Sequence, residues 1–247
     1  MRYGSAFYAR QMGTSEQSAR VVLPLIFELL RPASVVDFGC GVGTWLSVAR
    51  ELGAGRVAGL DGGYVDRKLL KIAPEEFRPA DLEHPAPVTG FDLAMSLEVA
   101  EHLSPLSAPR LVDALTGSAD AVLFGAAVPG QQGKRHVNCQ WQSWWAELFA
   151  QRGFLAFDPL RPTLWRRDDV SFWYQQNANL YLRRSRYEGS ALTARLKPIT
   201  ELRTLDVVHP KLYESYVRKY WKGPRGWLRR LLALTRRPGA SMWPLRP

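Results

Sequence analysis

Short apolar runs alternate along most of the chain with longer stretches whose apolar residues recur at helical spacing. This alternation, from about Ser15 to Leu182, is typical of an α/β protein in which helices connect the strands of one sheet. The predicted strands are Ser34–Phe38, Arg56–Leu60, Phe91–Leu97, Ala121–Ala127, Phe154–Phe157 and Ala178–Leu182, with a weaker candidate at Phe77–Pro79. The predicted helices are Ser15–Leu30, Thr44–Leu52, Val65–Ile72, Pro105–Thr116 and Trp141–Arg152. We expect Ser15 to cap the first helix.

Beyond Leu182 the pattern gives way to Arg-rich sequence punctuated by proline. Residues 191–247 carry the whole net charge of +10, so the rest of the chain is neutral overall. Within this basic segment, Trp227–Thr235 alternates basic and apolar positions at helical spacing, which predicts a short amphipathic helix. Such a helix either docks on the folded part of the protein or makes peripheral contact with an anionic membrane surface. Its charge would also attract phosphate backbones or an acidic partner.

The overall composition, with 46% hydrophobic and 23% charged residues, is that of a soluble globular protein. Two cysteines, Cys40 and Cys139, are too few for a disulfide framework or a four-cysteine zinc site. No run approaches the roughly 20 apolar residues that a membrane span needs. The segment 1–5 lacks the apolar core and cleavage pattern of a signal peptide. We therefore expect a cytoplasmic protein of bacterial type.

The strongest local signal is a glycine-rich turn, VVDFGCGVGTW, at positions 35–45. Its glycines, Gly39, Gly41 and Gly43, permit unusual backbone angles and let a ligand approach the main chain closely. In a doubly wound sheet this turn lies at the edge where ligands bind. Nucleotide-binding dehydrogenases have a similar turn, but here the spacing is G-x-G-x-G after an acidic residue, Asp37.

Three further motifs follow at the ends of later predicted strands. Asp61 ends the second strand, where a carboxylate can accept hydrogen bonds from both hydroxyls of a ribose. Asp81 follows the weak strand, where it could meet an adenine amino group. The run SLEVAEHL at 96–103 is a strand that continues into polar residues.

Together and in this order, these motifs resemble those of the class I S-adenosylmethionine-dependent methyltransferases, over about residues 21–182. VVDFGCGVG resembles the first motif, LD at 60–61 the second, AD at 80–81 the third and SLEVAEHL the motif after the fourth strand. The resemblance implies a Rossmann-like, doubly wound α/β sheet of seven strands with the last strand antiparallel. The later run at 126–141 is similar to a bacterial subgroup with small-molecule, natural-product or glycan-pathway neighbours.

The resemblance also assigns residues to the cofactor, S-adenosyl-L-methionine. The glycine turn would surround its methionine part, and Asp61 would hold its ribose, although a solvated turn residue is the alternative for Asp61 taken alone. Asp37 would order the turn or meet the cofactor's ammonium through a water. The predicted cofactor-binding residues are Asp37, Gly39, Cys40, Gly41, Gly43, Asp61, Asp81, Leu82, Leu97 and Glu98.

We expect residues 1–190 to form the S-adenosylmethionine-binding domain and residues 191–247 to form a basic C-terminal extension. Three aromatic residues precede the first predicted helix: Tyr3, Phe7 and Tyr8. They form either part of an N-terminal helical lid over the cofactor, within residues 1–20, or a disordered leader.

Methyl transfer to an oxygen or nitrogen requires alignment of the acceptor and removal of a proton, a role that suits histidine. The candidates are His136, in the polar loop after the fifth strand, and His102, for which a structural hydrogen bond is the alternative. Asn138 either contacts the acceptor or caps the helix near Trp141. Tyr174 could hydrogen-bond the acceptor from the segment before the last strand.

A metal site formed by Glu101, His102 and His136 is rejected, because these residues are distant in sequence and form no compact ligand pattern. The predicted set therefore contains no metal.

The leading prediction is methyl transfer to a small molecule or a sugar-containing metabolite. The first alternative is an enzyme that uses the cofactor otherwise, for instance by cyclising its aminobutyl part. The second is a nucleic-acid-binding protein acting through the basic tail. A neutral body and the missing Asn/Asp-Pro-Pro-aromatic signature of base-amino methyltransferases argue against nucleic acid.

Overall fold

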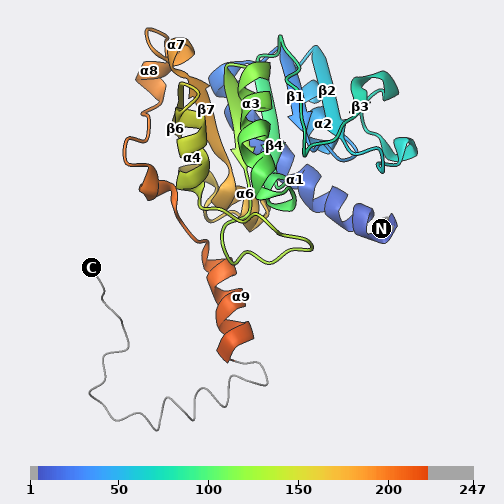
Figure 1. Cartoon of the computed structure of the whole chain (residues 1–247), viewed down its shortest axis with the longest axis vertical. Helices are drawn as coiled ribbons and strands as arrows, with labels where there is room; N and C mark the ends of the chain where they lie inside the picture. Colours follow the sequence, from blue (N-terminus) through green and yellow to red (C-terminus); the bar gives the residue numbers. More distant parts are fainter. Residues whose placement is uncertain (1–4, 222–247) are drawn as a thin grey trace. The chain divides into compact units, whose positions relative to one another are not determined.

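The strands of the described residues form one mixed sheet in the order β3-β2-β1-β4-β5-β7-β6 (Figure 1). The structure, a computed structural model, describes the backbone of residues 5–221 and the side chains of residues 13–219. The strands are β1 (Ser34–Phe38), β2 (Arg56–Asp61), β3 (Phe77–Pro79), β4 (Leu93–Leu97), β5 (Ala121–Gly125), β6 (Phe154–Phe157) and β7 (Asn179–Arg183). Neighbouring strands are parallel except around β7, which is antiparallel to both β5 and β6. The predicted seven-stranded sheet with an antiparallel last strand is confirmed.

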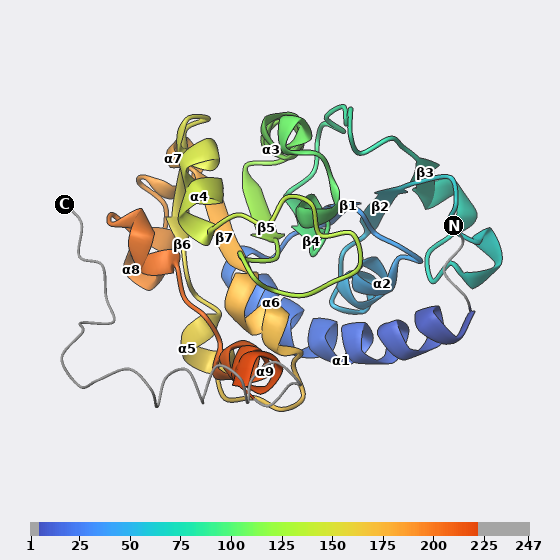
Figure 2. The same ribbon diagram turned by 60° about the horizontal axis from the view of Figure 1, so that its bottom comes forward.

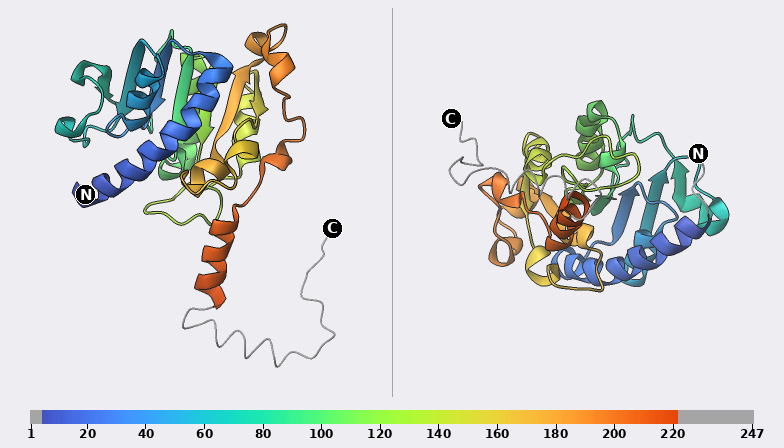
Figure 3. Two further views of the ribbon diagram at one scale, coloured as in Figure 1. Left: turned by 180° about the vertical axis from the view of Figure 1, so that it is seen from behind. Right: turned by 90° about the horizontal axis from the view of Figure 1, so that it is seen from below.

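Helices cover both faces of this sheet (Figures 2 and 3). The helices on one face are α1 (Ser5–Leu30), α2 (Thr44–Glu51) and α6 (Phe172–Asn177), and those on the other are α3 (Ala108–Ser118) and α4 (Gln142–Ala150). Successive strand residues point to opposite faces, so Val35 belongs to the core under α1 and α2, while Val36 belongs to the core under α3 and α4. Both valines are fully buried. The strands are buried on both sides, which explains their continuous apolar runs.

The C-terminal part of the chain contains more regular structure than the sequence predicts. The remaining helices are α5 (Arg161–Leu164), α7 (Arg184–Tyr187), α8 (Leu192–Arg195) and α9 (Pro210–Trp221). The chain divides into one compact unit of residues 1–207 and a second of residues 208–247, which includes α9. The first unit thus extends past the boundary expected at residue 190. Leu196 and Leu205 are buried in it, and the Ile199 N–H donates to the Ala156 carbonyl.

Two predicted helices differ from those observed. Helix α1 begins at Ser5, so Ser15 is not its cap but lies inside it, where its hydroxyl accepts from Trp45 Nε1 at 3.0 Å. The helix predicted at Val65–Ile72 is wrong, because only Arg67–Leu69 forms a 3-10 turn there. The Asp66 carboxylate accepts from the Lys68 N–H at the start of this turn, and local side-chain bonds of this kind compete with helix formation.

The predicted N-terminal helical region is present, although residues 1–4, with Tyr3, lie outside the described residues. Phe7 and Tyr8 lie on α1. The amphipathic helix predicted at 227–235 also lies outside the described residues. Within the described part of the chain, no helix combines the length and the apolar character needed to cross a membrane.

Candidate functional site

The loop that joins β1 to α2 contains the three glycines of the first motif, all with positive φ. Gly39 and Gly43 are closely packed: a Cβ on Gly39 would lie 2.2 Å from Val99 Cγ2, and one on Gly43 would lie 2.9 Å from Ile72 Cγ1. A Cβ on Gly41 would meet no atom within 4 Å. The open side of the loop is therefore at Gly41, where a ligand can approach the main chain.

These different surroundings predict different effects of alanine. Gly39→Ala combines a strained φ with a clash, so we expect it to lower the free energy of unfolding by about 2–4 kcal/mol. Gly41→Ala has only the strained φ, and we expect a loss of about 1 kcal/mol. Urea unfolding measures both. Equal losses in the two variants would contradict the different packing of the two glycines.

Asp61, at the end of β2, fixes the shape of this loop. Its Oδ2 accepts from the Gly41 N–H at 2.7 Å, and its Oδ1 accepts from the Gly62 N–H at 2.6 Å and the Tyr64 hydroxyl at 2.7 Å. The residue is only 6% exposed. A carboxylate can accept about four hydrogen bonds, so these three leave capacity for a ribose hydroxyl. The ribose contact stays a prediction, to which the structure adds a second role in holding Gly41.

Asp37 lies on β1 beneath the same loop and is 5% exposed. No described group has a hydrogen bond to its carboxylate. Burial, and then the charge of Asp61, raise the pKa of Asp37 to about 8. A buried carboxylate beside an open glycine loop fits a cationic ligand group, because a positive charge would offset the cost of burying the carboxylate.

The raised pKa predicts a pH dependence of stability in the cofactor-free protein. The folded-state pKa of Asp37 lies above the ordinary value of 3.8. Protonated Asp37 therefore contributes its full amount to the free energy of unfolding below pH 3.8. This contribution falls as the pH rises from there to about 8, by up to roughly 1.4 kcal/mol per pH unit. Asp37→Asn should remove this loss. Unfolding measured from pH 5 to 8 tests it, and parallel curves for the two proteins would contradict the assignment.

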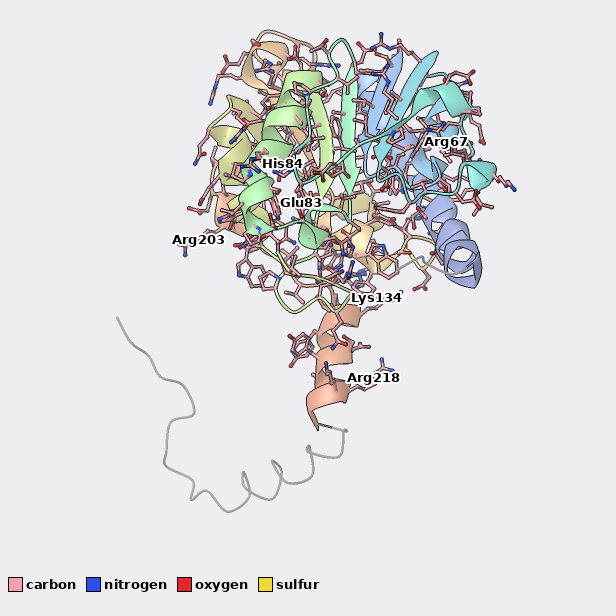
Figure 4. The ribbon with its side chains drawn as sticks, turned by 45° about the vertical axis from the view of Figure 1, so that its right-hand side comes forward. Arg67, Glu83, His84, Lys134, Arg203 and Arg218 are labelled. Atoms are coloured by element: carbon pink, nitrogen blue, oxygen red, sulfur yellow. The ribbon has the colours of Figure 1, made fainter. Side chains whose placement is uncertain are left out.

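Two other predicted cofactor residues have well-defined surroundings. Cys40 is buried against β2, since a Cβ on Gly59 would lie 2.6 Å from its sulfur, and burial raises the pKa of its thiol. Cys40 thus packs beneath the loop. Asp81 follows β3, is exposed, and lies 3.0 Å from His84 Nδ1, while Leu82 is buried. Figure 4 labels His84 and its neighbour Glu83 in this loop.

The end of β4 leads into a buried polar network. Leu97 is half-buried and Glu98 has a positive φ of 58°. The Glu98 carboxylate accepts from Asn177 Nδ2 at 2.7 Å and from Gln131 Nε2 at 2.8 Å. Gln176 joins through bonds to the Gln131 and Asn177 side-chain oxygens. The predictions did not include these three amides, although the polar run QQN before the last strand was a signal for two of them.

The loop after β5 is attached to the segment after β4. The N–H groups of Val137 and Asn138 donate to the Glu101 carbonyl at 2.8 and 3.1 Å, and Asn138 Nδ2 donates to the Ala100 carbonyl at 3.3 Å. The alternative that Asn138 caps the following helix is wrong, because Trp141 occupies the N-cap of α4 and no side-chain cap bond is present. Asn138 instead holds its loop beside Glu101.

This attachment places the two candidate histidines side by side. The ring centroids of His102 and His136 are 4.9 Å apart, in an edge-to-face arrangement. Ligand atoms of Glu101, His102 and His136 all lie within 4.8 Å of one another. Burial lowers the pKa of both histidines, so both favour the neutral form. The argument against a metal was that these residues are far apart in the sequence. It does not hold for the folded chain, which brings them together.

Tyr174 lies among core residues. It is 7% exposed, its ring centroid is 5.0 Å from that of Trp45, and its hydroxyl lies 3.4 Å from Ser15 Oγ. Burial raises the pKa of Tyr174 to about 12. This arrangement favours a packing role over the predicted contact with an acceptor.

A model of the methyltransferase domain family matches residues 8–157, more than half of the chain. The chain belongs to this methyltransferase family. The match confirms the resemblance to the class I S-adenosylmethionine-dependent methyltransferases that the motifs indicate. No curated protein matches the chain in sequence.

A solved structure shares the fold of this methyltransferase. The methyltransferase domain of the bacterial protein CtHen1 superposes with a TM-score of 0.52 at 17% identity, over 67% of this chain and 97% of that one. Human N-acetylserotonin methyltransferase gives a TM-score of 0.49 at 15% identity, over 74% of this chain. The present chain spans 60% of the length of that human enzyme.

The residues of this methyltransferase fit the cofactor of its class, S-adenosylmethionine. The open face at Gly41 accommodates a ligand against the main chain, and the buried Asp37 carboxylate suits a positively charged group. Asp61 retains acceptor capacity for a hydroxyl. Gly41 lies on the loop between β1 and α2, and Asp37 and Asp61 lie near the ends of the two strands beside it.

Proposed function

We propose that this protein transfers a methyl group from S-adenosylmethionine to an oxygen or nitrogen of a small molecule or sugar-containing metabolite. The proposal rests on one observation: two sets of residues lie at the carboxyl ends of neighbouring strands. The glycine loop and Asp61 follow β1 and β2, while His102 and His136 follow β4 and β5. Since β1 and β4 are adjacent, a cofactor at the first group would be next to an acceptor at the second.

S-adenosylmethionine supplies an activated methyl group when it is bound, so the protein has mainly to position and deprotonate the acceptor. Gly41 and Asp61 would hold the cofactor. His102 and His136 favour the neutral form, so either imidazole can receive the proton that the acceptor loses. The network of Glu98 and its amide partners would hold the β4 end rigid beneath them.

The direct test is product analysis. Purified protein is incubated with S-adenosylmethionine and a panel of metabolites that bear hydroxyl, amine or carboxylate groups. We expect acceptor-dependent formation of S-adenosylhomocysteine. Methylthioadenosine as the product would instead support cyclisation of the aminobutyl part. Salt-dependent binding of duplex DNA or RNA without either product would favour the nucleic-acid alternative.

A variant tests the acceptor end separately from the cofactor end. His136→Ala should lower turnover about 100-fold or more, while the affinity for S-adenosylhomocysteine stays within about 2-fold. Calorimetric titration and steady-state rates measure the two quantities. A parallel loss of both would assign His136 to the folding of its loop, and unchanged turnover would exclude it from the reaction.

A further inference from the structure

Glu101, His102 and His136 form a compact group of nitrogen and oxygen ligands beside the proposed acceptor position. Glu101 and His102 belong to a 3-10 turn, Ala100–His102, directly after β4, and His136 belongs to the loop after β5. Figure 4 labels Lys134 in that loop. Their ligand atoms all lie within 4.8 Å of one another. Tetrahedral ligands at about 2.1 Å from one cation lie about 3.4 Å apart, so binding requires the widest pair to approach by up to about 1.4 Å.

The carboxylate of Glu101 gives an independent indication of a cation. The residue is 1% exposed, and neither of its carboxylate oxygens has a hydrogen-bond partner among the described residues. The adjacent carboxylate, Glu98, accepts hydrogen bonds from two neutral amides, and neither amide brings a positive charge. A buried carboxylate without a partner is costly, and a second acidic group nearby increases that cost. A bound cation would remove it.

In each histidine Nδ1 faces a main-chain carbonyl, which leaves Nε2 as the candidate ligand atom. His102 Nδ1 faces the Arg135 carbonyl at 3.4 Å, and donation to that carbonyl leaves a lone pair on Nε2. His136 Nδ1 faces the Gln131 carbonyl at 3.1 Å, while Gly133 lies against its Nε2. The backbone beside the cluster is strained, since Glu98 and Arg135 both have positive φ. Such strain is concentrated at functional sites.

We propose that Glu101, His102 and His136 bind one divalent metal cation, and that this cation takes an oxygen of the methyl acceptor as a further ligand. Two imidazoles and one carboxylate form a ligand set that favours first-row transition metals, such as Mn²⁺, Co²⁺ or Zn²⁺, over Mg²⁺. Three protein ligands leave coordination positions open for a substrate. A bound divalent cation also makes an acceptor hydroxyl more acidic. The part of the proposal that concerns the acceptor rests on the proposed function; the metal site itself does not.

The test is metal binding by the full-length, tag-free protein after treatment with a chelator, measured without cofactor or acceptor. Calorimetric titration with MnCl₂ and ZnCl₂ should show one site per chain, and Co²⁺ should give visible absorption bands of a protein-bound ion. Glu101→Gln, His102→Ala and His136→Ala should each weaken binding at least about 10-fold. His84→Ala, which removes an exposed histidine outside the cluster, is the matched control and should bind as the wild type does.

Thermal unfolding gives a second measurement of metal binding. Saturating Mn²⁺ or Zn²⁺ should raise the Tm of the wild-type protein and of His84→Ala, but not that of His136→Ala. Absence of one-site binding in the folded wild type would overturn the proposal. Binding that is lost in His84→Ala and kept in the cluster variants would also overturn it.

Activity separates this proposal from the proposed function. Formation of S-adenosylhomocysteine that stops with chelator and returns with Mn²⁺ or Zn²⁺ would support both. Equal formation in chelator by a protein that binds no metal would overturn the cation site and leave methyl transfer standing. One-site metal binding by a protein that methylates no acceptor in the panel would support the cation site and contradict the proposed function.

Discussion

Replacement of Asp61 by alanine is expected to lower the affinity for S-adenosylhomocysteine about 10- to 150-fold, which corresponds to about 1.5–3 kcal/mol for the loss of hydrogen bonds to a charged group. The structure gives two reasons for so large an effect. The variant loses the predicted acceptor for the ribose, and it frees the Gly41 N–H that Asp61 holds at 2.7 Å. Isothermal titration calorimetry on the folded variant measures the change.

Asp81→Ala, at the residue predicted to contact the adenine, is the comparison for this experiment. Asp81 is also an acidic residue at the end of a strand, but it is exposed and bonded to His84. We expect its replacement to change the affinity less than about 5-fold, since an exposed group contributes less than a buried one. If Asp61→Ala were to bind as tightly as the wild type, Asp61 would have no part in the cofactor site.

The second large expected effect is the loss of folding when the chain is cut short of residue 207, where the first compact unit ends. A chain that ends at residue 190 is expected to fail to fold, whereas a chain that ends at residue 207 should fold and bind S-adenosylhomocysteine. The shorter chain loses the buried Leu196 and Leu205 and the bonds from the Ser143 N–H and hydroxyl to Asp206. Each buried leucine contributes about 2–5 kcal/mol, which together approaches the whole stability of a typical domain.

Circular dichroism and calorimetric titration on both truncated chains test this expectation. A folded, ligand-binding chain of 190 residues would place the domain boundary where the sequence pattern put it. The double substitution Leu196→Ala, Leu205→Ala in the full-length chain is the companion experiment. It should lower the free energy of unfolding by roughly 4–10 kcal/mol without shortening the chain.

Sequence patterns predicted the sheet well, because mostly buried strands appear as short apolar runs. The ranges Ser34–Phe38 and Phe154–Phe157 agree with observed strands, and so does the weaker candidate Phe77–Pro79 at the sheet edge. The glycine loop was equally predictable, since its three positive φ angles require residues without a side chain. Features fixed by local backbone chemistry were thus accessible from the sequence.

Other features were not accessible from the sequence. The helix predicted at Val65–Ile72 failed for a local reason, because the Asp66 side chain caps a short turn there. The metal-ligand group depends on bonds from Val137 and Asn138 to the Glu101 carbonyl, which no spacing rule reports. Packing of residues 191–207 was hidden because these residues were grouped with the strongly basic sequence that follows them.

The reversed direction of β7 decides which part of the chain can reach the ligand-binding edge. In a parallel sheet, only segments that follow a strand arrive at that edge, whereas β7 delivers the segment that precedes it. Gln176 and Asn177 therefore enter the network around Glu98 from the amino-terminal side of a strand. Under the proposed function, changes at Gln176 and Asn177 would alter the acceptor side at positions outside the turns that follow β1 and β2. Selection for a new acceptor would act on these two amides while the methyl-donor side stays intact.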